Sequence, residues 1–318
     1  MNTEKTAAAI DIQGLTKTYK KTRKAPAKQA LKGIDLTIPR GMMFGLLGPN
    51  GAGKSTMINI LAGLVVKTSG TAKICGYDIE QQTRQARASI GVVPQEISMD
   101  VFFSPRQALE NQAGFYGVPK SERRTDEILK ALGLYDKRDA YVRQLSGGMK
   151  RRLLIAKALV HNPPVLILDE PTAGVDIELR RQLWDYVMEL HANGTTIILT
   201  THYLEEAEAL CDHIAIIHNG EITANEDKKT LMGRLDQKTL VITPMAPLSD
   251  IPAQLQAWKT ELRDEGTLAI TYHTSRTKIP EILETLQAAN ISISDLRTEE
   301  PDLEDIFMAL TYAREKTG

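Results

Sequence analysis

The chain has 318 residues, with 39 lysines and arginines against 40 aspartates and glutamates and 42% hydrophobic residues. This composition is that of an ordinary folded protein, which excludes a disordered or fibrous chain. The net charge of −1 argues against a nucleic-acid-binding protein, which carries a basic excess. Two cysteines are too few for a disulfide framework. We find no signal peptide and no apolar stretch of membrane-spanning length, and expect a reducing, cytosolic compartment.

Strands alternate with helices over roughly residues 10–220, which predicts an open α/β sheet. The runs VLILD and TIILT are continuous and apolar, a pattern typical of parallel strands covered on both faces. Further strands are expected over 10–19, 31–38 and 42–48, and helices over 54–64, 121–133, 148–161 and 177–192. Between about 96 and 162 the pattern turns helical, so a helical subdomain is expected to interrupt the sheet order there.

The chain changes character after about residue 235. Residues 239–244, 267–273 and 290–296 are strand-like, and apolar side chains recur at helical spacing over 279–286 and 303–310. The sequence therefore predicts two domains. One is an α/β domain over residues 10–235, and the other is a small α+β accessory domain over residues 236–318.

The segment GPNGAGKS fits the phosphate-binding pattern G-x-x-x-x-G-K-[ST]. It follows a predicted buried strand and begins a predicted helix, where backbone N–H groups and the helix dipole favour an anion. Lys54 is expected to reach the β- and γ-phosphates of a nucleotide, Ser55 to ligate Mg²⁺, and Thr56 to touch the α-phosphate. The strand–loop–helix context disfavours a chance match. The residues expected to line this cradle are Gly48, Pro49, Asn50, Gly51, Ala52, Gly53, Lys54, Ser55 and Thr56.

Two carboxylates end the apolar run that follows Pro164. Asp169 can hold the Mg²⁺ shell, and Glu170 can orient and deprotonate the water that attacks the γ-phosphate. Taken alone, the pair could equally be a solvated acidic turn, but the phosphate loop upstream favours the catalytic interpretation. A phosphate loop by itself leaves kinases, GTPases and recombinase-type motors open.

The segment LSGGM decides among these classes. It places the Ser146 hydroxyl and the amides of Gly147 and Gly148 at a helix start, which is a second anion site. With it the sequence resembles the ATP-binding cassette (ABC) ATPases, whose signature is LSGGQ. The other motifs stand in the family's order: the adenine-stacking aromatic at Tyr19, the Q-loop at Gln95, the D-loop ending at Asp176, and the switch histidine at His202.

This resemblance implies a P-loop NTPase fold, with a RecA-like α/β core, an N-terminal antiparallel β subdomain and a helical subdomain. It also implies ATP and Mg²⁺ as cofactors. In the family two cassettes stack head to tail, so Ser146 and Gly148 would act on ATP held by the phosphate loop of a second copy. Gln95 would contact Mg²⁺ and the attacking water, and His202 the γ-phosphate.

Met149 departs from the family's glutamine at the last position of the signature. A thioether donates no hydrogen bond, but the groups that face the phosphate are kept, so activity is expected to persist. Plainer interpretations also exist for three residues. Tyr19 could only pack in its strand, His202 could be an ordinary core or surface histidine, and Asp176 could only cap the following helix.

One phosphate loop excludes the translation-factor relatives, and the short stretch from Gln95 to Ser146 excludes relatives with an inserted coiled coil. The interpretation that remains is a transporter ATPase that works with a separate transmembrane permease, and we expect it at the cytoplasmic face of the bacterial inner membrane. LSGGMKRR and the tail EEPDLEDIFMALT over 299–311 resemble multidrug, drug-resistance or lipid exporters. An importer ATPase and an ATP-binding switch protein without transport stay open as alternatives.

Overall fold

The computed structural model describes the chain apart from residues 1–7, 22–25, 176, 247, 264–265 and 313–318. The chain divides into two compact units, Met1–Lys228 and Lys229–Gly318. The boundary expected from the sequence, after residue 235, lies a little further along the chain, beyond the short helix α8 (Lys228–Met232).

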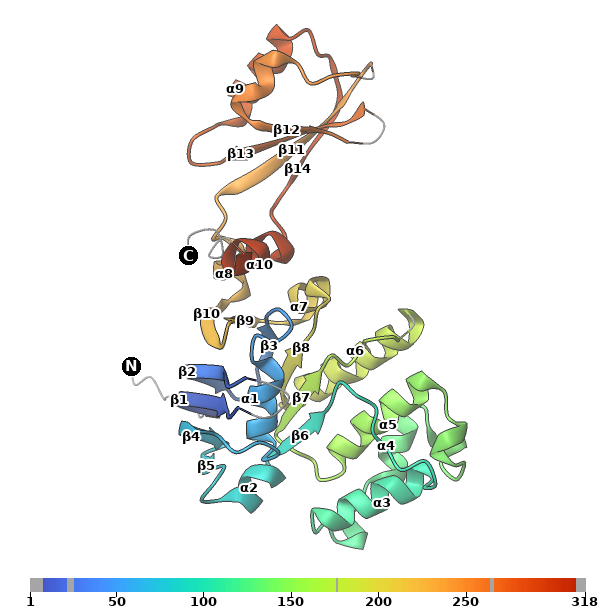
Figure 1. Cartoon of the computed structure of the whole chain (residues 1–318). Coiled ribbons are helices and arrows are strands. Elements are labelled where there is room, and N and C mark those ends of the chain that lie inside the picture. The colour runs from blue at the N-terminus through green and yellow to red at the C-terminus, as the bar shows by residue number, and fades with distance from the viewer. Residues whose placement is uncertain (1–7, 22–25, 176, 247, 264–265, 313–318) are drawn as a thin grey trace, which may run out of the picture. The chain divides into compact units, whose positions relative to one another are not determined.

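The first unit contains a four-stranded antiparallel sheet in the order β2-β1-β4-β5 (Figure 1). The two long strands match the predicted ones and extend beyond them, whereas the two short ones have no predicted counterpart because they are polar and mostly exposed. The strands are β1 (Ala8–Tyr19), β2 (Lys28–Pro39), β4 (Ser69–Ile74) and β5 (Tyr77–Asp78).

A second sheet of six strands, in the order β10-β9-β3-β8-β7-β6, forms the centre of this unit. Its pairs are parallel except for the edge pair of β10 and β9. Every residue of β3, β7 and β8 is buried, as the apolar runs predicted. The strands are β3 (Met43–Leu47), β6 (Ile90–Val93), β7 (Val165–Asp169), β8 (Thr196–Thr200), β9 (His213–His218) and β10 (Glu221–Asp227).

Seven α-helices are described within this unit, and three of them fill the helical stretch between β6 and β7. The helix predicted over 121–133 is broken, because Arg123 takes an extended backbone between a 3-10 turn (Lys120–Glu122) and α4. The helices are α1 (Lys54–Leu61), α2 (Thr83–Ala88), α3 (Pro105–Phe115), α4 (Thr125–Ala131), α5 (Gly147–Leu159), α6 (Ile177–Ala192) and α7 (Leu204–Leu210).

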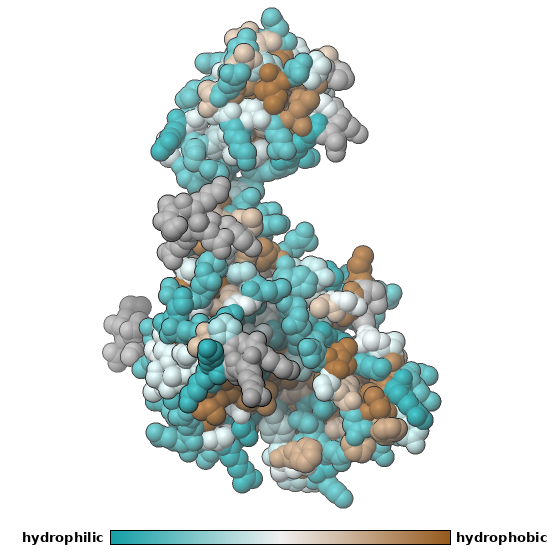
Figure 2. Space-filling model, in the orientation of Figure 1, coloured by the Kyte–Doolittle hydropathy of each residue, from teal (hydrophilic) through white to brown (hydrophobic). Residues whose placement is uncertain are grey.

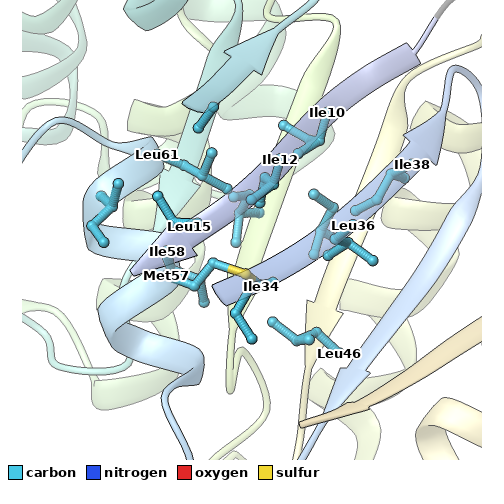
Figure 3. Close-up of a cluster of buried hydrophobic side chains, with 14 of the residues drawn as sticks. Ile10, Ile12, Leu15, Ile34, Leu36, Ile38, Leu46, Met57, Ile58 and Leu61 are labelled. Atoms are coloured by element: carbon cyan, nitrogen blue, oxygen red, sulfur yellow. The ribbon is translucent and has the colours of Figure 1, made fainter. Parts of the chain in front are cut away.

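One hydrophobic cluster joins both sheets of the first unit to α1. Met57, Ile58 and Leu61 on α1 point toward β1 and β2, as Figure 3 shows, and Leu46 of β3 lies nearby. The same cluster takes in side chains of β7 and β8. Helix α1 is therefore fixed by packing along its length, and the loop before it is held at a constant place relative to the ends of the strands.

The second unit is an antiparallel sheet in the order β12-β13-β11-β14 with helix α9 packed on one face through Ile282 and Leu286. The strand expected over 290–296 begins later, because Asn290 has φ +56° in the turn that follows α9. The elements are β11 (Gln237–Pro244), β12 (Lys259–Leu262), β13 (Leu268–His273), α9 (Ile279–Ala288), β14 (Ile293–Glu299) and α10 (Leu303–Tyr312). Among the described residues, no helix has the length and apolarity needed to cross a bilayer.

Candidate functional site

The predicted phosphate cradle is the loop between β3 and α1. A Cβ atom at Gly48 would collide with the backbone carbonyl of Ile217, and one at Gly53 would lie 2.9 Å from the carbonyl of Ala30. Gly53 also has φ +120°, a backbone conformation that disfavours side chains. The sequence folds this way because glycine alone lets the loop pass so close to β2 and β9. The result is a loop wrapped around the N-terminus of α1.

Lys54, the first residue of α1, folds back over this loop. Its ammonium donates to the carbonyl oxygens of Gly48 and of Pro49, the latter at 3.2 Å. Burial lowers the pKa of Lys54, while the nearby carboxylates of Glu170 and Asp169 act to raise it. The cation is thus held beside two carboxylates and at the mouth of an anion-binding loop, where a phosphate would replace the carbonyl contacts.

Asp169 is the last residue of strand β7 and Glu170 follows it, and the surroundings of the two side chains differ. Asp169 accepts a hydrogen bond from the Thr200 hydroxyl on β8, and burial raises the pKa of its carboxyl group. Glu170 has φ +49°, and its N–H donates to the carbonyl of Thr200 at 2.9 Å. This left-handed backbone turns the Glu170 side chain away from the strand direction, a strained geometry typical of functional positions.

Two predicted site residues converge on the Glu170 carboxylate. The amide nitrogen Nε2 of Gln95 donates to Oε2 at 2.8 Å. The ring nitrogen Nδ1 of His202 lies 3.3 Å from the same oxygen, and the His202 side chain is 52% exposed. Gln95 comes from the segment after β6 and His202 from the segment after β8, so three neighbouring strands of the sheet deliver this cluster.

A cleft joins this cluster to the phosphate loop. The sequence pattern missed Lys28 and Ala30, the first and third residues of β2, because neither belongs to a motif. Lys28 reaches the loop, with its ammonium near Gly51. The lining residues are Tyr19, Lys28, Ala30, Pro49, Asn50, Gly51, Gly53, Lys54, Ser55, Thr56, Gln95 and Glu170.

The predicted signature residues stand apart from this cleft, on α5. Ser146 caps the helix, and its hydroxyl accepts a hydrogen bond from the Met149 N–H at 3.2 Å. Gly147 has open space where a side chain would be. With Gly148 it begins the helix, and none of the three residues is among those that line the cleft with Lys54. Asp176, the expected D-loop carboxylate, lies outside the described residues.

Arg151 contacts the backbone beside Gln95 and the backbone of Glu170, which the sequence patterns did not predict. It lies on α5 two residues after Met149 and is only 4% exposed. Its guanidinium donates to the backbone carbonyls of Pro94 at 2.8 Å and of Glu170 at 3.3 Å. In the sequence it is one of three consecutive basic residues, and nothing in that run distinguishes the buried one from its neighbours.

Oxygen atoms suited to Mg²⁺ lie on the residues predicted to hold it. Because Nε2 of Gln95 donates its hydrogen bond to Glu170, the Oε1 oxygen of Gln95 is the atom that could bind a cation. Ser55 supplies a hydroxyl group and Asp169 a carboxylate. Within the described part of the chain, no group of three His, Cys, Asp or Glu side chains could hold a metal. Mg²⁺ is commonly bound by one or two carboxylates together with substrate phosphates, and the single carboxylate of Asp169 with the Ser55 and Gln95 oxygens fits a cation bound with a nucleotide.

Apolar side chains are exposed on the helical stretch of the first unit. Phe115 at the end of α3 is 86% exposed and Phe102 is 67% exposed. Figure 2 shows hydrophobic side chains, in brown, on the surface of this stretch at the lower right. A groove beside this stretch is lined by apolar and polar residues. They include Leu64, Tyr116 and Lys157. Such exposed apolar surface is typical of a protein–protein contact.

Comparisons with known proteins point to one family. Residues 31–173 match the family described as ABC transporter. The chain is 35% identical to the linearmycin resistance ATP-binding protein LnrL of Bacillus subtilis, over 95% of this chain and 98% of the relative. It is also 35% identical to the daunorubicin/doxorubicin resistance ATP-binding protein DrrA of Streptomyces peucetius, over 98% and 94%. The Nod factor export ATP-binding protein I of Burkholderia thailandensis is 41% identical, over 71% and 73%.

Solved structures agree with this assignment. An ATP-binding subunit of an ABC transporter matches with a TM-score of 0.64 and 29% identity, covering 71% of this chain and 92% of that chain. A dimeric ATP-binding cassette in a post-hydrolysis state, bound to ADP and Pi, matches with a TM-score of 0.62 and 29% identity, over 69% and 98%. The chain therefore belongs to the ABC transporter family, as an ATP-binding subunit that hydrolyses ATP.

Proposed function

We propose that this chain powers the export of a drug-like, lipid-like or glycolipid-like compound through a separate transmembrane permease. The relatives named for linearmycin and daunorubicin resistance align with nearly the whole chain, second unit included, which supports the export direction. The observation that carries the proposal is the convergence of Gln95 and His202 on one oxygen of Glu170, beside the loop that holds Lys54.

The main residues of the site then have defined roles in hydrolysis. ATP lies along the cleft, with its adenine on Tyr19 and its phosphates in the loop before α1. Lys54 leaves the carbonyls of Gly48 and Pro49 and pairs with the β- and γ-phosphates. Glu170 accepts a proton from the attacking water, and Gln95 and His202 hold that water and the γ-phosphate in line. The neighbouring strand ends keep these groups within reach of one another.

Ser55, Gln95 and Asp169 would hold Mg²⁺ at this site. The cation would neutralise charge on the phosphate groups of the nucleotide. The buried Asp169 carboxyl, whose pKa is raised by its surroundings, would be stabilised as a carboxylate by the arriving cation.

Two copies are needed for turnover, because Ser146, Gly147 and Gly148 lie outside the cleft of their own chain. Their helix start would close over the γ-phosphate held by a second copy, with Asp176 at the same interface. Each dimer then carries two shared sites, and ATP favours the closed state while hydrolysis favours the open one.

The permease would dock on the exposed apolar side chains of the helical stretch, among them Phe102 and Phe115. This contact would hold the chain at the cytoplasmic face of the bacterial inner membrane. Gln95 follows β6, and the chain after Gln95 continues into the helical stretch that carries these apolar side chains. Movement of this segment on ATP binding would thus reach the permease.

Glu170→Gln and Lys54→Ala test the proposal. Glu170→Gln keeps the shape of the side chain but removes the base, so it should bind ATP and lose at least about 100-fold in kcat. In Mg²⁺–ATP it should elute from a sizing column as a dimer. Lys54→Ala should lose ATP binding and stay monomeric, as a matched control. Undiminished turnover in Glu170→Gln, or a monomer in saturating ATP, would contradict the proposed function.

A further inference from the structure

The guanidinium of Arg151 ties together the two backbone segments that carry the catalytic contact. Nη1 donates to the carbonyl of Pro94, the residue before Gln95, and Nη2 donates to the carbonyl of Glu170 itself. The side chains of Gln95 and Glu170 meet at 2.8 Å. One buried cation therefore joins the two segments on the backbone side, while the two side chains meet on the side of the cleft.

The backbone of Glu170 needs such support. At φ +49° it lies in a region that costs a non-glycine residue free energy, and it persists only where neighbours fix it. Its N–H is held by the Thr200 carbonyl at 2.9 Å, and its own carbonyl is held by Arg151. The peptide units before and after the Glu170 Cα are thus both hydrogen-bonded, and the direction of the carboxylate follows from them.

Arginine is suited to this place for a geometric reason. Its planar fork presents donors that reach two acceptors at once, and it is desolvated more readily than an ammonium group. A lysine has all its donors on one nitrogen, so it cannot occupy both of the positions that Nη1 and Nη2 take, and at least one of the two bonds would be lost or lengthened. At 4% exposure water has little access to replace the missing bond.

We propose that Arg151 is a positioning residue for ATP hydrolysis, which sets the direction of the Glu170 carboxylate and its distance from Gln95. The inference rests on the proposed function, because Glu170 acts there as the base. Arg151 touches neither the nucleotide nor the water, so it acts through the other two residues. Its place on α5 also links this geometry to the helix that begins with the signature residues.

The test compares Arg151→Met and Arg151→Lys with Arg152→Met. Arg152 is the neighbour of Arg151 on α5, and it donates to the carbonyl of Leu132 at 2.8 Å, after α4 and away from Glu170. Its loss removes a hydrogen bond from α5 to a backbone carbonyl that belongs neither to the segment of Gln95 nor to Glu170. All variants are made in the full chain, and kcat, the KM for ATP, ATP affinity and Tm are measured together.

Arg151→Met and Arg151→Lys should lower kcat by about 10- to 100-fold, the range expected for a base displaced by up to 1 Å. Their ATP affinity should stay within about twofold of wild type, because the phosphate loop is unchanged. Arg152→Met should keep a kcat close to wild type at a comparable loss in Tm. Arg151→Lys keeps the charge and most of the volume, so it serves if Arg151→Met does not fold.

A double-mutant cycle with Gln95→Ala separates positioning from a general effect on folding. If Arg151 acts through Gln95 and Glu170, its loss should cost clearly less in the Gln95→Ala background than in wild type. Additive losses in kcat would overturn the inference, and so would a kcat of Arg151→Met and Arg151→Lys equal to that of Arg152→Met. In either case, turnover of ATP by the wild-type protein would leave the proposed function intact. Wild-type protein without ATPase activity would instead overturn the proposed function, and the inference with it.

Discussion

Glycine is required in the phosphate loop for two separate reasons, the backbone conformation and the space beside the loop. Gly53 is required for its backbone conformation as well as for space, whereas Gly48 is required for space, because a side chain there meets the Ile217 backbone. The pattern G-x-x-x-x-G-K-[ST] alone does not separate these reasons. Gly147 in the signature has neither constraint within the described part of the chain, because a Cβ atom there would meet open space.

Gly48→Ala should therefore destabilise the first unit even without nucleotide. The added methyl collides with a backbone carbonyl of β9, which cannot rotate away, and overpacking of this kind costs about 1–3 kcal/mol. Tm should fall by several degrees. Gly147→Ala, whose methyl meets open space, should leave Tm nearly unchanged. Equal Tm values for the two variants would show that the loop can shift away from β9.

At the scale of elements, three segments meet at His161, just after α5. Its ring stacks on Tyr116 at the end of α3, with centroids 3.6 Å apart, and Nε2 contacts the carbonyl of Ile90 in β6 at 3.1 Å. Burial lowers the pKa of His161 to about 4, although the bond to Ile90 favours the charged form. A neutral His161 thus joins the helical stretch to the central sheet.

This junction should weaken in mild acid. Because the folded pKa lies below the unfolded value of about 6.5, the contribution of His161 to stability is present above pH 6.5 and is lost as the pH falls toward 4. The free energy of unfolding in urea should decline over this range more steeply for wild type than for His161→Phe, which keeps an aromatic ring and cannot titrate. Parallel curves for the two proteins would contradict this account.

The elements also show what the sequence can predict and where it fails. The apolar runs at β7 and β8 and the phosphate loop could be located because their patterns are local and continuous. The break at Arg123 and the strands β4 and β5 could not, because they depend on partners distant in the sequence. The contacts of Arg151 could not be predicted for the same reason, because only the fold brings its side chain to the carbonyls of Pro94 and Glu170.

At the scale of the whole molecule, the residues that line the cleft and the signature residues belong to different elements of the first unit. The cleft residues come from β1, β2, α1 and the ends of β6 and β7, whereas Ser146 begins α5. The second unit has its own sheet and core and contributes none of the residues that line the cleft. The resistance proteins align with this unit as well as with the first.

In the proposed function, hydrolysis uses the phosphate loop of one copy and the signature of another. Lys54→Ala and Ser146→Arg should each be inactive alone, since every site in either homodimer lacks one essential part. When the two are mixed, mixed dimers contain one site with an intact Lys54 and an intact Ser146. The ATPase rate of the mixture should rise well above the sum of the separate rates. A mixture no more active than that sum would contradict the shared site.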